Sequence, residues 1–490
     1  MLPCVVLALA LAAPAAAQNG TPAFAWQRDY LFAALEQQFE QARRQPLAAV
    51  RGQFQTLATT HRGALAAVSG ARSRVPLGAL QTLEQTQFRL AALAAAHEPL
   101  LATTHALITE TRLAVGAAAR RWPVQHADVH EAVYRVLYGG RAAIEEVLVQ
   151  QRATALPALT LLAHVPSAAP STLIEGVRVH SGDIILSRGD APTSALIARG
   201  NPFPGNFSHV AIVHVAPESG QATVVEALIE RGVVTASAED FLKEKRHRLL
   251  LLRLRPEHPA LRANPLAAHR AASTILQHAR AAHVPYDFGM DWTDGARMFC
   301  SEVVHYAYRS AGIDLWARPA QLTSPGLVRW LGDMGVTQFT TLVPSDLEYD
   351  PRLAPVAEWR NLETLNADRL DNVTLDVLLE GAERGDRLGY DPLAYLPGGL
   401  AKLWSGLQSA LGATPVIPAG MSVEAALRAR SLNNTVHPRL RTAIGNAAEQ
   451  YRTQRGYRPP YWALTDLARQ ALASLRASLA PALSTSTEGP

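Results

Sequence analysis

The stretch MFCSEVVHYAY, residues 298–308, has the pattern of an amphipathic helix with a cysteine in its first turn. Counted from Cys300, apolar residues recur at offsets of 3, 4, 7, 8 and 11, which line one face of an α-helix that Gly312 is expected to end. At a helix start, the unpaired N–H groups and the positive end of the helix dipole stabilise a thiolate. The same N–H groups can receive the negative charge of an attacked carbonyl oxygen. Cys300 is therefore a candidate nucleophile.

The first 20 residues, MLPCVVLALALAAPAAAQNG, have the pattern of a secretory leader (residues 1–17) cleaved near Ala17. No Lys or Arg precedes the apolar run, which departs from the usual pattern, and the run is too short to span a bilayer. We therefore expect a periplasmic or secreted protein. The chain has 2 cysteines, and removal of the leader leaves Cys300 alone. Because unpaired cysteines are usually lost in oxidising compartments, its presence favours a chemical role over that of a buried, inert cysteine.

The composition is that of a globular protein, with 48% hydrophobic and 18% charged residues in a chain of 490. This length has room for two or three domains. The net charge of +4 allows weak, peripheral association with the cell envelope. The basic residues are not clustered with aromatic residues, so nucleic-acid binding is not expected. No later apolar run reaches transmembrane length.

The chain divides into three zones after the leader. Residues 18–165 are rich in Ala, Leu, Gln and Arg at helical spacing and predict an N-terminal helical bundle. The segment HVPSAAPST, residues 164–172, is a linker. Residues 172–320 form the predicted catalytic domain, and residues 321–490 a C-terminal, mostly helical region broken by loops.

The middle zone predicts an α+β unit. A helical run at residues 265–282 and the Cys300 helix accompany four short runs of strand type, with turns such as RGNPFPGNF between them. The strand-type runs are GDIILSR at 182–188, SHVAIVHV at 208–215, TVVEALI at 223–229 and RLLLLRLR at 248–255.

A thiol nucleophile needs a base, and the second strand offers two histidines. His209 and His214 are five residues apart, so their side chains point to opposite faces of a strand. His209 follows a Gly- and Pro-rich loop, where side chains commonly reach a cleft, and is the favoured base. His214 is interpreted as a surface or packing histidine.

Glu226 is the candidate third member of the site. It shares a strand face with Val224 and Leu228, so an inward face would bury a carboxylate among apolar neighbours. Such a carboxylate needs a partner, and a histidine on the adjacent strand provides one. The alternative is a solvent-facing glutamate on an edge strand.

Five motifs now carry a resemblance. In chain order they are GDIIL, FSHVAIVHV, VVEA, PYDFGMDW and FCSEVVHYAY. Together they resemble the circularly permuted, papain-like branch of the NlpC-type cysteine peptidases, the YiiX-like group, over about residues 175–315. In the permuted branch the histidine strand precedes the cysteine helix, as it does here. The resemblance implies a papain-like catalytic domain with an antiparallel sheet and helices, flanked here by the two helical regions.

The resemblance also implies roles for single residues. Cys300 matches the nucleophile, His209 the general base and Glu226 the orienting residue. Tyr286 matches the tyrosine beside the nucleophile, and Asp183 belongs to the GD turn near the cleft. These last two are the expected substrate-site residues, Asp183 also closing its turn.

The activity implied is acyl transfer from an amide, in a cell-wall or related peptide, through a thioester on Cys300. No metal or cofactor is expected. A zinc site made of His180, Asp183, His209 and His214 lacks compact ligand spacing and is disfavoured.

Two other functions stay open. The permuted architecture also resembles lipid acyltransferases, which would take an acyl-lipid substrate. A non-catalytic helical envelope scaffold or binding protein is the third hypothesis. The sequence leaves open the oligomeric state and whether DWTDGARM, residues 291–298, lines the cleft or covers it.

Overall fold

The computed structural model describes residues 30–151, 156–390, 402, 417, 420–480 and 482–485. The predicted secretory leader, residues 1–17, lies outside the described residues. In the described part of the chain, no helix combines the length and the apolar character that crossing a membrane requires.

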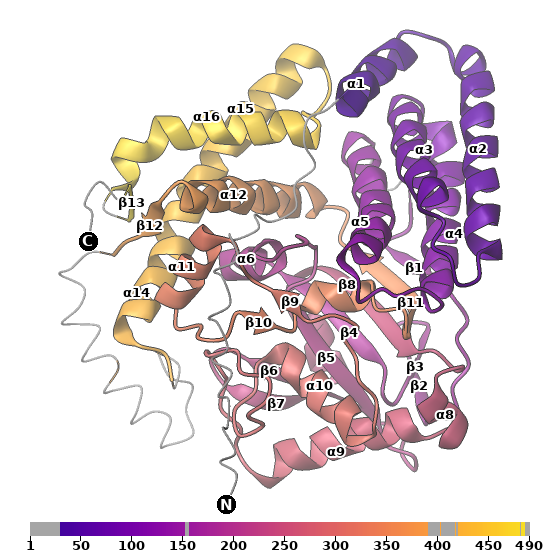
Figure 1. Cartoon of the computed structure of the whole chain (residues 1–490). Helices are drawn as coiled ribbons and strands as arrows, with labels where there is room; N and C mark the ends of the chain where they lie inside the picture. Colours follow the sequence, from indigo (N-terminus) through magenta and orange to yellow (C-terminus); the bar gives the residue numbers. More distant parts are fainter. Residues whose placement is uncertain are drawn as a thin grey trace, which may run out of the picture.

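A seven-stranded sheet lies at the centre of the molecule (Figure 1), in the order β1-β11-β8-β4-β5-β6-β7. All six neighbouring pairs are antiparallel. The α+β fold class and the four predicted strands are thus confirmed, with ends shifted by one or two residues. The strands are β1 (Leu159–Leu161), β4 (Ile184–Gly189), β5 (His209–Val215), β6 (Ala222–Leu228), β7 (Gly232–Ser237), β8 (Arg246–Leu254) and β11 (Leu353–Arg360).

The sheet takes in strands from both sides of the predicted catalytic range, residues 172–320. β1 follows the N-terminal helices, and β11 lies in a region that the sequence predicted to be helices and loops. That prediction was wrong for β11, whose residues are almost all buried. Because both faces of the strand are covered, it shows no polar alternation, and short apolar runs of this kind are ambiguous.

Two helices, α9 (Ala267–Ala281) and α10 (Cys300–Ser310), share a core with the sheet. Val303, Val304 and Ala307 of α10 are fully buried there, as the helical spacing predicted. Burial of each such valine side chain contributes about 1.5–3 kcal/mol. Gly312, with a φ of 75°, follows the end of α10 in the left-handed conformation that glycine adopts easily.

Two groups of helices lie on the side of the molecule away from α9 (Figure 1). The N-terminal group is α1 (Tyr30–Arg43), α2 (Leu47–Gly70), α3 (Leu77–Ala96), α4 (Leu101–Ala119) and α5 (Ala127–Gln150). The C-terminal group is α11 (Pro325–Asp333), α12 (Leu365–Glu383), α14 (Val423–Ser431), α15 (His437–Arg455) and α16 (Tyr461–Leu479). Smaller elements are α6 (Pro192–Arg199), α7 (Ala238–Lys243), α8 (Pro259–Ala263), β2 (Ser171–Ile174), β3 (Val177–His180), β9 (Ala320–Gln321), β10 (Thr340–Thr341), β12 (Asp386–Leu388) and β13 (Leu483–Thr485).

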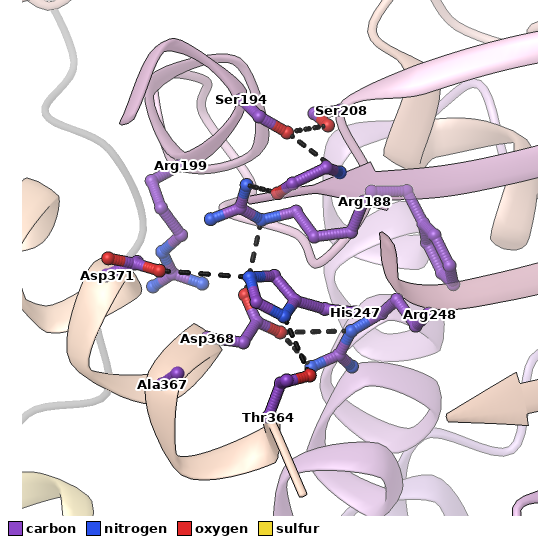
Figure 2. Close-up of polar contacts among 12 residues, drawn as sticks. Arg188, Ser194, Arg199, Ser208, His247, Arg248, Thr364, Ala367, Asp368 and Asp371 are labelled. Atoms are coloured by element: carbon purple, nitrogen blue, oxygen red, sulfur yellow. Dashed lines mark hydrogen bonds and ion pairs between the residues drawn. The ribbon is translucent and has the colours of Figure 1, made fainter. Parts of the chain in front are cut away.

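A buried charge cluster joins the sheet to both helical groups, and Figure 2 shows its contacts with α12. Arg188 of β4 and Arg248 of β8 are direct neighbours across the sheet, and both are almost completely buried. Like charges placed opposite each other destabilise a sheet. Asp368 of α12 pairs with both guanidinium groups, at 3.2 Å from Arg188 Nε, and Glu145 of α5 lies 2.5 Å from Arg248 Nη1. These two carboxylates therefore connect α5, the sheet and α12 by ion pairs.

Candidate active site

Cys300 is the first residue of α10 and is only 5% exposed. Phe299 before it has an extended backbone and provides no side-chain cap. The first N–H groups of a helix have no carbonyl partner within that helix. The backbone N–H of Met298 donates to Pro285 O at 3.0 Å, which holds the segment containing Tyr286 beside the helix start.

The structure brings Cys300, His209 and Glu226 together. His209 lies beside Cys300, which acts on the pKa of its imidazole, and its Nε2 atom lies 2.6 Å from Glu226 Oε2. Glu226 is 1% exposed, so the imidazole supplies the partner that its buried carboxylate needs. His214 lies elsewhere, with its ring 5.3 Å from that of His269 on α9.

The two histidines lie on opposite faces of β5, as expected. However, His214 and not His209 lies on the face that packs against α9 and α10. Val210 and Ile212 share the core of α9 and α10, so strand alternation places His214 on that same face. His209 takes the alternate position and reaches the thiol because it is the first residue of the strand. The start of β5 and the start of α10 therefore meet at the site.

The electrostatics of the site favour a charged imidazole. Burial alone would lower the pKa of His209, but hydrogen bonds to Cys300 and Glu226, and the charges of both groups, raise it to about 10. At neutral pH the imidazole therefore carries its proton. An imidazolium beside the thiol stabilises the thiolate.

Glu226→Gln is expected to lower the pKa of His209 by about one to three units, because a neutral amide replaces the anionic partner. The ring titration of His209, followed by NMR, measures this shift. Glu230→Gln, which neutralises a carboxylate just after the same strand, should leave the titration unchanged. An unaltered His209 titration in Glu226→Gln would contradict the coupling.

Tyr286 lies half-buried next to the thiol. Burial, followed by the charges of Cys300 and Asp287, raises the pKa of its hydroxyl well above the usual value. Its ring lies 5.1 Å from that of Phe288. The charge of Cys300 thus acts on the Tyr286 hydroxyl, and the part of Tyr286 in binding a substrate stays a prediction.

Asp183 has a different position from the one expected of a substrate contact. Its carboxylate accepts two 2.7 Å hydrogen bonds from Arg253 and one of 2.8 Å from His180 N–H, and the residue is 1% exposed. A substrate therefore finds no free surface on Asp183, and the expected substrate-binding role is corrected to a structural one. The adjacent Gly182 carbonyl accepts from Tyr308 Oη, which ties this turn to α10.

The four residues considered for zinc are held in separate contacts. His180 Nδ1 lies 2.9 Å from the carbonyl oxygen of Ala169, while Asp183, His209 and His214 have the partners described above. Among the described residues, no group of three or more His, Cys, Asp or Glu side chains is arranged to hold a metal ion.

The sequence analysis did not single out Glu302. It lies in the first turn of α10 and is 1% exposed, and the nearby Phe299 N–H acts to lower the pKa of its carboxyl. The sequence does contain a signal for a glutamate at this position. A glutamate three residues after the N-cap position is the second half of a capping box, in which the side chain reaches back to the N-cap N–H.

The thiol lies at a helix start, next to a histidine that a buried carboxylate holds and beside an antiparallel sheet. This arrangement defines a cysteine hydrolase of the papain-like class. Residues 178–357 match the model of a family described as permuted papain-like amidase enzymes, YaeF/YiiX, C92 family. This match confirms the resemblance over more than a third of the chain and identifies a cysteine hydrolase of the amidase or peptidase type. No curated protein and no solved structure matches the chain.

Proposed function

We propose that this protein is an exported cysteine hydrolase that cleaves an amide bond in a cell-wall or related peptide. The observation that carries the proposal is the position of His209, beside Cys300 and hydrogen-bonded to the buried Glu226. The leader pattern of residues 1–17 and the single cysteine that would remain after its removal support export.

In the proposed mechanism the Cys300 thiolate attacks the amide carbonyl carbon. N–H groups at the start of α10 hold the oxyanion that forms. His209 gives its proton to the leaving amine as the C–N bond breaks, leaving a thioester on Cys300. His209 then takes a proton from water, which attacks the thioester. The C–S bond breaks, so the carboxylic acid leaves and the thiol of Cys300 is free again. Glu226 orients the imidazole and stabilises its charged form.

The test is hydrolysis of peptides released from cell wall by the full chain without residues 1–17, followed by mass spectrometry of new amines. We expect Cys300→Ala to lower the rate at least about 10³-fold, because no other group forms the thioester. Ser310→Ala, at the other end of α10, is the matched control and should keep the wild-type rate. Hydrolysis that survives in Cys300→Ala would reject the mechanism.

Acyl transfer to a lipid or alcohol is a second outcome of the same assay. An apolar groove is lined by α1, α3 and α5 and by residues that include Tyr457 and Trp462, and no predicted site residue lines it. The matched family is described as amidases, so amide hydrolysis is the better-supported function. Transfer of the acyl group to an added alcohol, with no free acid formed, would reverse this choice.

A further inference from the structure

Glu302 has an unusual environment for a glutamate in a first helical turn. The residue is 1% exposed, and its Oε2 atom is buried without a hydrogen-bond partner among the described residues. The hydroxyl of Ser301 and both ring nitrogens of His305 are buried and unpartnered in the same way. This side of α10 therefore holds polar groups that are shielded from solvent.

The loop before α10 supplies further negative charge. Asp287 is 1% exposed, and its carboxylate accepts hydrogen bonds from the N–H groups of Gly289 and Asp291, at 2.9 and 2.6 Å. Trp292 packs edge-on against His305, with ring centroids 5.1 Å apart, so the loop lies along this side of the helix. Asp294 pairs with the exposed Arg297 at 3.3 Å.

These surroundings oppose the ionisation of Glu302. Burial, and after it the charges of Asp287, Asp291 and Asp294, raise the pKa of its carboxyl to about 8, against the lowering effect of the Phe299 N–H. At neutral pH the side chain is therefore mostly a neutral acid. An ionised glutamate two residues from Cys300 would repel the thiolate and take up the positive potential of the helix start.

We propose that Glu302 is a positioning residue for the Cys300 thiolate, held buried as a neutral acid so that the helix start stays free to stabilise the thiolate and the oxyanion. This inference rests on the proposed function, because it concerns the same thiolate. His305, which faces the same side of α10, stays neutral in this setting, since burial lowers its pKa.

Alkylation of Cys300 by iodoacetamide, measured one pH unit below and one above the Glu302 pKa of about 8, tests the inference. We expect Glu302→Gln, which resembles the neutral acid, to react within about twofold of wild type at the lower pH. At the higher pH, where wild-type Glu302 ionises, the variant should react at least about threefold faster. Glu239→Gln, an exposed first-turn glutamate of α7, is the control and should follow wild type at both pH values.

Superimposed profiles of wild type and Glu302→Gln would overturn the inference, as would a variant that is slower at both pH values. Infrared difference spectra between wild type and Glu302→Gln give a second test: a buried protonated carboxyl band that only wild type shows should be present at the lower pH and weaken at the higher one, and the absence of such a band would also overturn the inference. A thiol that reacts like ordinary cysteine in both proteins would reject the proposed function itself. A fast thiol with superimposed profiles would reject only the role of Glu302.

Discussion

His209→Ala is expected to slow the alkylation of Cys300 at neutral pH by at least about tenfold and to lower amide hydrolysis by about 10³-fold or more. The imidazolium lies beside the thiol, and its pKa of about 10 keeps it charged well above neutral pH. Without it, the thiolate loses its nearest positive charge and the leaving amine loses its proton donor.

His214→Ala is the matched control, since this histidine lies on the same strand but against His269 rather than the thiol. In His214→Ala, the alkylation of Cys300 and the hydrolysis of the amide should both proceed at the wild-type rate. Circular dichroism must show that both variants are folded. Equal alkylation rates in the two variants would show that the contact between His209 and Cys300 has no chemical consequence.

The helix of Cys300 could be predicted because its apolar spacing is local information, and Val303, Val304 and Ala307 are buried as that spacing required. Strand alternation separated His209 from His214 correctly, but it did not show which face α9 and α10 would cover. Which face of the strand the helices cover depends on the packing of the whole core. The approach of His209 to the thiol follows from its place at the very start of β5, which periodicity does not reveal.

Long-range partners account for most of what the sequence could not show. Asp183 was expected at the substrate, but it pairs with Arg253, which is 70 residues away in the chain. Nothing local announces such a pair. Likewise, β11 completes the sheet from beyond the predicted domain end, and its fully buried run resembles part of a helix.

Asp368→Asn is expected to destabilise the protein by about 3–5 kcal/mol, because it leaves Arg188 and Arg248 buried opposite each other without the charge between them. The free energy of unfolding in urea measures the loss. Burial alone would raise the pKa of Asp368, but Arg248 and Arg188 together lower it. A lowered pKa means that its stabilising contribution is present above the unfolded-state value of about 3.9 and is lost as the pH falls through the folded-state value.

Glu380→Gln, on the same helix as Asp368, is the control, because Asp368 belongs to a buried ion pair whereas Glu380 belongs to an exposed one. Its partner Arg469 lies 2.7 Å away, but side-chain exposures of 33% and 50% let solvent screen the interaction, so we expect a change of at most about 1 kcal/mol. Asp368 connects α12 to β4, and Ser187 of β4 lies opposite His209 in the sheet. Loss of the Asp368 charge should therefore loosen the C-terminal helices from the catalytic sheet. A single unfolding transition, shifted equally by both variants, would instead mean that the buried pair contributes no more than a surface one.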